Sequence, residues 1–169
     1  MLDLPCGTGQ SFKALHEGIR PEGRYVGVDA SRGMLSRAKL RGRGHETAHF
    51  LQADARTFSG TDLEAQGLPP QVDRLHVFLG LTTFADWEQA WGNLWSLLRP
   101  GGRFVVVDVF NDRPGLQGRM VEIMAQADLS RRAWSPIEAV AEGFDRQTLS
   151  NEAVFGGELW LACGRKPQG

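Results

Sequence analysis

The stretch Met1–Gly9 reads MLDLPCGTG, and the fold is decided there. Its apolar start, Met1–Leu4, has the length of a strand, Gly7 and Gly9 place a turn directly after it, and Ser11–Gly18 has helical spacing. Glycine allows positive φ and close approach of the backbone to a ligand, and a helix N-terminus offers unpaired amide donors. The stretch therefore predicts either a ligand-binding loop or a plain strand-to-helix turn, since short glycine motifs are common.

Apolar segments of strand length alternate with segments of helical spacing along the rest of the chain, which is typical of a parallel sheet covered by helices. The further strands expected are Tyr25–Val28, His49–Leu51, Val72–Leu79, Arg103–Val109, Phe144–Leu149 and Glu158–Cys163, and the further helices are Ser31–Leu40, Asp86–Leu98, Gln117–Ala127 and Pro136–Glu142. The last two strands flank a polar, glycine-bearing connection around Asn151–Gly157, which indicates a hairpin. We predict an α/β fold with a Rossmann-like, seven-stranded, mostly parallel sheet, helices on both faces and a C-terminal antiparallel hairpin, in one domain over residues 1–169.

The helix expected at Asp86–Leu98 has the clearest pattern. Pro100–Gly102 is expected to end it in a tight turn before the apolar run FVVVDV. Trp87, Trp91 and Trp95 recur every four residues, the spacing of a stripe packed on a sheet, so we expect packing rather than an aromatic cage for a substrate.

Composition excludes several classes of protein. The 19 basic residues balance 20 acidic ones, so no global positive field attracts nucleic acid. Cys6 and Cys163 have neither a metal-ligand nor a C-x-x-C spacing, so we expect no metal site and a reducing cytoplasm. No apolar run approaches the roughly 20 residues of a transmembrane helix, and no secretory signal is recognisable.

Two carboxylates follow the second and third expected strands. Asp29 comes about twenty residues after the glycine turn, where a carboxylate can accept both hydroxyls of a ribose. Its alternative role is to cap the helix that begins at Ser31. Asp54 follows the next strand. Because ligands bind outside the carboxyl ends of strands in an open α/β sheet, both acids and the glycine turn are expected at one site.

Four motifs, in order, resemble those of the class I S-adenosylmethionine-dependent methyltransferases. DLPCGTG is similar to the family's D-L-G-C-G-T-G, and YVGVDASRGMLSRAK to its G-I-D-x-S-x-x-M-L-x-x-A. QADA and LRPGGRFVVVD resemble its third motif and its Pro-Gly-Gly turn with fifth strand. The resemblance covers nearly the whole chain.

The resemblance implies a methyltransferase that binds S-adenosylmethionine. It places Asp29 on the ribose, Met34 on the adenine face, and Asp54 with the Ala55 backbone at the adenine amino group. Asp3 would hold either the loop or the cofactor's ammonium group, and Leu79–Leu81 would line the methionine part. The residues expected at the cofactor are Asp3, Pro5, Cys6, Gly7, Gly9, Asp29, Ala30, Met34, Asp54, Ala55, Leu79 and Gly80.

The methyl acceptor is expected to be a small molecule. The stretches LGLTTFADWEQA, LSRRAW and FGGELWLACGRK are similar to the group that includes quinone-biosynthesis and phospholipid N-methyltransferases, so lipid-like acceptors are among the candidates.

The chain departs from the family pattern at two places. Pro5 replaces the first glycine of the glycine motif, and proline fixes φ and lacks an amide donor, so we expect a different turn there. Met1 falls inside the first strand, so the helices that precede it in the family are expected to be absent and the chain to be a fragment.

Methyl transfer from a sulfonium requires no covalent nucleophile, so Cys6 is expected to be a small buried residue. An acceptor that loses a proton would need a general base. The candidates are His76, which is otherwise a satisfied core histidine, Asp86, which is otherwise a helix N-cap, and Asp108, which is near the end of a strand and could face the site.

Two rival functions stay open. A nicotinamide-dependent oxidoreductase also has a glycine loop followed by an acid, but Phe12 stands where the dinucleotide fingerprint needs its third glycine. A non-catalytic cofactor-binding or interaction module is the second rival, which Pro5 and the absent N-terminal helices both favour.

Overall fold

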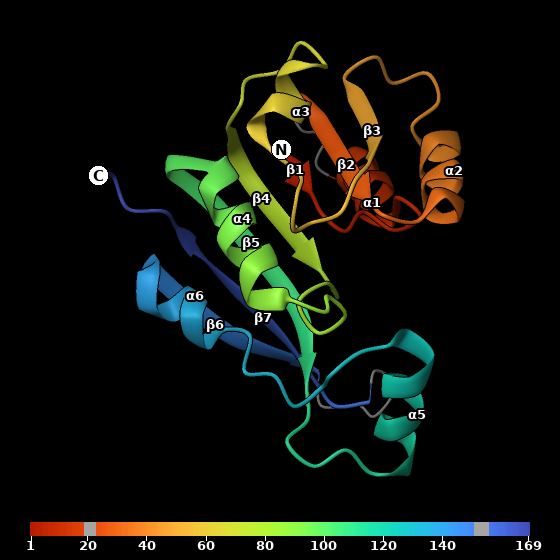
Figure 1. The fold of residues 1–169 in the computed structure, drawn as a ribbon, viewed down its shortest axis with the longest axis vertical. Helices are drawn as coiled ribbons and strands as arrows, with labels where there is room; N and C mark the ends of the chain where they lie inside the picture. Colours follow the sequence, from red (N-terminus) through yellow and green to blue (C-terminus); the bar gives the residue numbers. More distant parts are fainter. Residues whose placement is uncertain (19–22, 151–155) are drawn as a thin grey trace.

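The computed structural model describes residues 1–18, 23–150 and 156–169, and a seven-stranded sheet forms its centre (Figure 1). The strands lie in the order β3-β2-β1-β4-β5-β7-β6. Strands β1 to β5 are parallel, and β7 is antiparallel to both β5 and β6. Their bounds are β1 Leu2–Asp3, β2 Tyr25–Asp29, β3 Ala48–Gln52, β4 Val72–Phe78, β5 Leu98–Phe110, β6 Glu142–Ser150 and β7 Glu158–Arg165. The expected fold class is confirmed.

Six helices connect or flank these strands within the described residues: α1 Gln10–Gly18, α2 Arg32–Arg41, α3 Gly60–Glu64, α4 Trp87–Leu97, α5 Leu116–Ala125 and α6 Ser135–Val140. Sequence analysis missed α3. Ser59 and Asp62 form a capping box at its start, in which the Asp62 carboxylate accepts the Ser59 amide at 2.7 Å. That S-x-x-D pattern was readable, and the shortness of the helix hid it.

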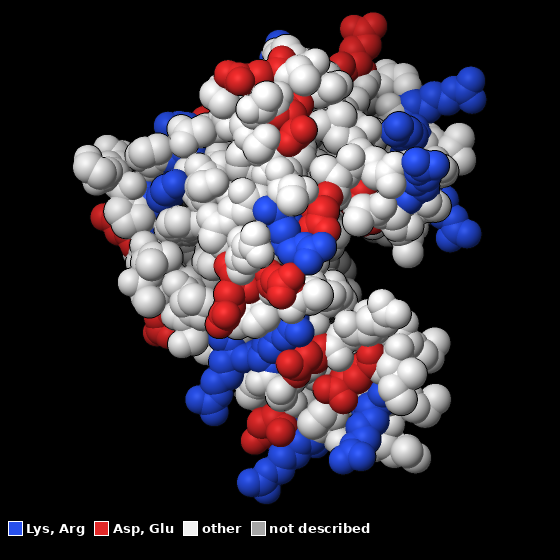
Figure 2. All heavy atoms as spheres, in the orientation of Figure 1, with Lys and Arg blue, Asp and Glu red and all other residues white. Residues whose placement is uncertain are grey.

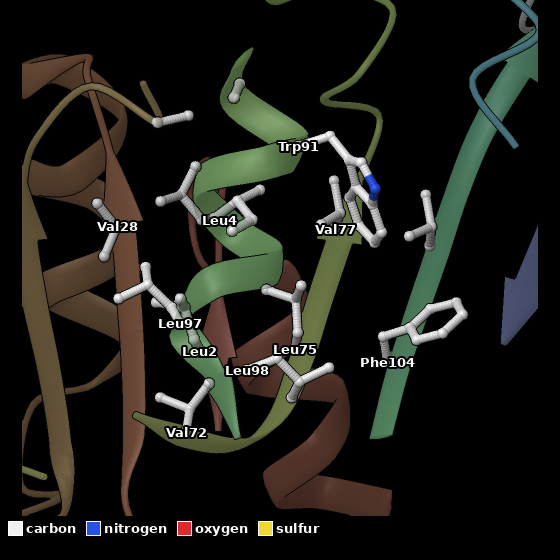
Figure 3. Close-up of a cluster of buried hydrophobic side chains, with 14 of the residues drawn as sticks. Leu2, Leu4, Val28, Val72, Leu75, Val77, Trp91, Leu97, Leu98 and Phe104 are labelled. Carbon is white, nitrogen blue, oxygen red and sulfur yellow. The ribbon is translucent and has the colours of Figure 1, made fainter. Parts of the chain in front are cut away.

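Alternate residues of the central strands build the main hydrophobic core on one face of the sheet (Figure 3). Leu75 and Val77 of β4 and Phe104 of β5 point to this face and meet Trp91 of α4. The centroids of the Trp91 and Phe104 rings are 6.0 Å apart. Trp87 and Trp95 pack on the same core from positions four residues away, so the expected tryptophan stripe is confirmed.

The opposite face of the sheet has two parts, one covered by helices and one that lines a cavity. Over β2 and β3, α1 packs through Phe12, whose ring is 4.9 Å from that of Tyr25 and 5.6 Å from that of Phe50. Leu35 and Ala38 of α2 form a second buried cluster beside Phe50. Over β4, β5 and β7, the same face lines a cavity.

The Pro-Gly-Gly segment corrects one prediction. We expected a tight turn followed by a strand from Arg103, but β5 already begins at Leu98, which pairs with Val72. The Gly101 amide donates to the Lys166 carbonyl at 2.9 Å, and the Lys166 amide donates to the Gly102 carbonyl at 2.9 Å. These bonds incorporate the segment into the sheet as a bulge.

The C-terminal hairpin is confirmed by the antiparallel pairing of β6 and β7. Of its expected connection, Asn151–Gly157, residues 151–155 lie outside the described part of the chain. The helix expected at Gln117–Ala127 is α5, which spans Leu116–Ala125.

Candidate functional site

One large cavity begins at the carboxyl ends of β1 to β4 and continues over the open face of β4, β5 and β7. Its volume is about 1890 Å³, which exceeds the roughly 300–1,000 Å³ of a pocket for one small ligand. Figure 2 shows the molecule hollowed between the part that carries α1 and α2 and the lobe that carries α5. The cavity has room for two ligands side by side.

The glycine loop forms the first wall. The Cys6 amide donates to the Val28 carbonyl at 2.9 Å, and the Gly9 amide donates to the Cys6 carbonyl at 2.9 Å, which closes the turn. Gly7 has φ 54°, lines the cavity, and has no described atom within 4 Å of where a Cβ would stand. A ligand can therefore approach the backbone closely at Gly7.

Gly9 has a different reason to be glycine. Its φ is 81°, and a Cβ there would lie 3.1 Å from the Ala38 Cα of α2. Gly9 is buried and does not line the cavity. It allows close packing of the loop on α2, so its expected contact with a cofactor is not supported by its position.

Asp29 is held in a defined orientation at the end of β2. Its two carboxylate oxygens accept the Gly7 amide at 2.9 Å and the Ser31 amide at 2.8 Å. The residue is only 8% exposed, yet it lines the cavity. The capping role falls to Ser31, whose hydroxyl accepts the Met34 amide at 3.3 Å. Since a carboxylate has about four acceptor sites, Asp29 keeps acceptor capacity for a ligand.

Asp54 is engaged by a neighbour that sequence analysis missed. Arg56 donates to Asp54 Oδ1 from its amide at 2.9 Å and from Nε at 3.0 Å, and to Oδ2 from a terminal nitrogen at 2.7 Å. These bonds lower the pKa of the Asp54 carboxyl below its usual value. The other terminal nitrogen of Arg56 donates to Asp86 at 2.8 Å.

This contact also corrects the role expected of Asp86. The residue stands at the N-cap position of α4, but its side chain makes no capping hydrogen bond and pairs with Arg56 instead. Nothing in the spacing of the sequence pointed to Arg56, because an exposed arginine is ordinarily a solvated surface residue.

Asp3 is fully buried, between Tyr25 and His76. It accepts a short hydrogen bond from the Tyr25 hydroxyl, and His76 Nδ1 lies 2.8 Å from its other oxygen. Burial, followed by the charge of Asp3, raises the pKa of Tyr25, so the phenol stays neutral. Asp3 therefore braces strands β1, β2 and β4, and it does not line the cavity where an ammonium group would bind. The imidazole of His76 has a hydrogen-bond partner in Asp3, as expected for a core histidine. His76 also lines the cavity.

Asp108 is not the exposed base that sequence analysis allowed. It is fully buried, and it accepts the Thr82 hydroxyl at 2.6 Å, the Thr82 amide at 3.1 Å and the Val109 amide at 2.9 Å. Burial raises the pKa of its carboxyl, which these hydrogen bonds partly offset. The residue fixes the loop after β4 and lies outside the cavity lining.

Pro5 fits the loop through its contact with Gly80. A Cβ at Gly80 would stand 2.5 Å from the Pro5 Cδ, so the ring packs directly on the Gly80 backbone. The amide that proline lacks is not needed for the turn, because the Cys6 and Gly9 amides close it. Gly80 is buried behind Leu79, which lines the cavity with φ 53°.

The cavity therefore brings together most of the residues expected at the cofactor. Those that line it are Pro5, Cys6, Gly7, Asp29, Ala30, Met34, Asp54, Ala55 and Leu79, whereas Asp3, Gly9 and Gly80 support them from behind. Burial raises the pKa of the Cys6 thiol, which disfavours the nucleophilic thiolate. Sequence analysis also missed Arg41, which donates to the Thr8 carbonyl at 2.5 Å and so ties α2 to the glycine loop.

Comparison with known proteins identifies relatives of this chain. The family model described as "Methyltransferase domain" matches residues 2–104. The chain is 37% identical to a demethylmenaquinone methyltransferase of Thermus thermophilus over 110 residues, which are 64% of this chain and 46% of that protein. It is 32% identical to a 2-phytyl-1,4-naphtoquinone methyltransferase of Thermosynechococcus vestitus over 107 residues, which are 63% of this chain and 44% of that protein. The matches thus span less than half of each relative.

The solved structures agree on the fold. The N-methyltransferase NodS from Bradyrhizobium japonicum, in complex with S-adenosylhomocysteine, superposes with a TM-score of 0.72 at 16% identity, covering 98% of this chain and 76% of that one. At this identity the likeness shows a shared fold. No helix in the described part of the chain has the length and apolarity needed to cross a membrane.

Proposed function

The chain belongs to the methyltransferase-domain family, and from this premise we propose that it binds S-adenosylmethionine and transfers the methyl group to a small-molecule acceptor. The bound cofactor would supply an electrophilic methyl group on a sulfonium, and the leaving thioether is neutral. The protein's own task is then to bind, orient and exclude water.

The observation that carries the proposal is the pairing of Gly7 with Asp29. The loop leaves space at Gly7 where a side chain would stand, and the adjacent Asp29 carboxylate keeps acceptor capacity beside that space. This combination suits a ribose, whose two hydroxyls donate to one carboxylate. Met34, 44% exposed at the cavity, offers an apolar side chain to the adenine face.

The acceptor would occupy the part of the cavity over β4, β5 and β7. Its lining there includes Phe78, Val105, Val107 and Leu161, and Phe78 is 40% exposed. Such a wall favours an apolar, ring-bearing or lipid-like acceptor. The quinone methyltransferases among the relatives support that class.

His76 is the side chain proposed to take a proton from an acceptor that must lose one. Asp3 fixes the imidazole through Nδ1, so Nε2 is the nitrogen left for the acceptor. Asp108 is excluded from this task by its burial.

Titration calorimetry with S-adenosylmethionine, S-adenosylhomocysteine and NAD tests the proposal. We expect both sulfur compounds to bind and NAD not to bind. Asp29→Ala should weaken binding by about 100-fold or more, because two hydrogen bonds to a charged acceptor are lost. Asp73→Ala, at an exposed aspartate paired with Arg99, is the matched control and should bind as the parent does.

The results have distinct meanings. If the folded chain binds NAD and neither sulfur compound, the oxidoreductase interpretation replaces this one. If Asp29→Ala unfolds, Asp29→Asn, which keeps an acceptor oxygen and loses the charge, should still weaken binding. Unchanged affinity in a folded Asp29→Asn protein would refute the ribose role.

A further inference from the structure

Arg56 occupies the acceptor capacity of Asp54. The Arg56 backbone amide and Nε both donate to Oδ1, at 2.9 and 3.0 Å, and Nε and a terminal nitrogen both reach Oδ2, at 3.2 and 2.7 Å. A carboxylate has about four lone-pair sites. The four contacts come from three N–H groups, with the single Nε hydrogen shared between the two oxygens, and they take up most of this acceptor capacity.

The same guanidinium has a second partner. Its remaining terminal nitrogen donates to Asp86, in front of α4, at 2.8 Å. Arg56 and Asp54 both line the cavity, so a base bound there would meet the guanidinium and the carboxylate together. When a base binds, Asp86 can still neutralise the charge of Arg56, so the guanidinium can remain beside Asp54.

We propose that Arg56 sets the nucleobase selectivity of this site, by satisfying Asp54 and so making the 6-amino group of a purine a weak determinant of binding. This rests on the proposed function, since it concerns the base of the same cofactor. A free Asp54 carboxylate would accept a hydrogen bond from a 6-amino group and repel a 6-oxo group. With Arg56 in place, the amino group gains little, and a 6-oxo group meets a donor instead of a bare carboxylate.

The experiment compares two ligands that differ at that position, S-adenosylhomocysteine and its deaminated counterpart S-inosylhomocysteine, by calorimetry. We expect the parent protein to bind both within about threefold, because no strong hydrogen bond distinguishes them. Arg56→Ala removes the side-chain donors and leaves only the backbone amide on Oδ1. The preference of this variant for the amino compound should therefore rise to about tenfold or more, the usual effect of a hydrogen bond to a charged group.

Two control variants separate selectivity from general damage. Asp86→Ala removes the second partner and leaves the four contacts with Asp54, so the ratio of the two dissociation constants should stay at the parent value. Arg99→Ala removes another exposed arginine paired with an aspartate, Asp73, and should change neither constant.

The ratio decides the outcome. A ratio that rises in Arg56→Ala supports the proposal, even if both affinities change, because a merely structural role would move both constants together. A parent that already prefers the amino compound by more than about tenfold, or an unchanged ratio in Arg56→Ala, overturns it. If the parent binds neither ligand, the proposed function itself has failed.

Discussion

The acids near the strand ends differ between the two halves of the sheet: the first half has two that line the cavity besides the buried Asp3, whereas Asp108 of the second half is buried. In the half formed by β1, β2 and β3, Asp29 and Asp54 line the cavity, and α1 and α2 pack on the sheet behind it. In the half formed by β4, β5 and β7, the acid Asp108 is buried under a loop, and the strand face itself lines the cavity. The first half therefore presents polar groups from loops, and the second presents a strand face of apolar side chains with arginines along one edge.

This difference fits the separate tasks that we propose for the two halves. Oriented carboxylates and a glycine loop suit a polar ligand that is always the same, such as a cofactor. A broad apolar strand face suits an acceptor that differs between relatives. The comparison can be tested by substituting the features that distinguish the halves.

The largest effect is expected at Asp108. Asp108→Ala leaves the Thr82 hydroxyl and the Thr82 and Val109 amides without their acceptor inside the protein, so the free energy of unfolding should fall by about 3 kcal/mol or more. Asp54→Ala, whose side chain is 41% exposed, should lower it by only about 0.5 kcal/mol. Urea unfolding of both variants measures the contrast, and equal losses would contradict the proposed difference between the halves.

The first half was largely predictable from sequence because its signals are local. Gly7, Gly9, Asp29 and Asp54 each follow a short apolar strand directly, so their position at one edge follows from the parallel sheet. The burial of Asp108 depends on Thr82, 26 residues away, and the course of Gly101 depends on Lys166. Such pairings arise only when distant segments meet, and no spacing within either segment reveals them.

A smaller effect is expected from a row of arginines on the second half. Arg74 pairs with Arg103, and Arg103 with Arg165, so the three exposed side chains lie side by side along one edge of the cavity. None has an ion pair with another described residue. Because like charges directly opposite each other destabilise a sheet, Arg103→Thr should raise the free energy of unfolding by up to about 1 kcal/mol at low salt.

Arg103→Thr could also stabilise the sheet because threonine has a higher strand propensity than arginine. Added salt screens the repulsion between arginines and leaves that propensity unchanged, so it distinguishes the two causes. The gain measured by urea unfolding should shrink when roughly 0.5 M salt is added. Arg99→Thr, which breaks a pair with Asp73, should give no gain at either salt concentration. A gain in Arg103→Thr that does not depend on salt would show that the row is not under electrostatic strain.

The smallest effect is expected in the first half, at His16 of α1. Its ring lies 4.5 Å from that of His45, and desolvation, followed by the charge of His45, lowers the pKa of His16 below the ordinary 6.5. A histidine with a lowered pKa in the folded state binds protons more readily when unfolded. Its contribution to stability is therefore present above about pH 6.5 and is lost as the pH falls through the lower, folded pKa.

Urea unfolding at about pH 7.5 and 5.5 should thus show a loss of stability that His16→Gln reduces. His49→Gln, on β3, should keep the loss, since it leaves the His16 and His45 pair intact. A loss of stability that persists unchanged in His16→Gln would show that it does not arise from the His16 and His45 pair. That result would place the acid sensitivity of the fold outside α1.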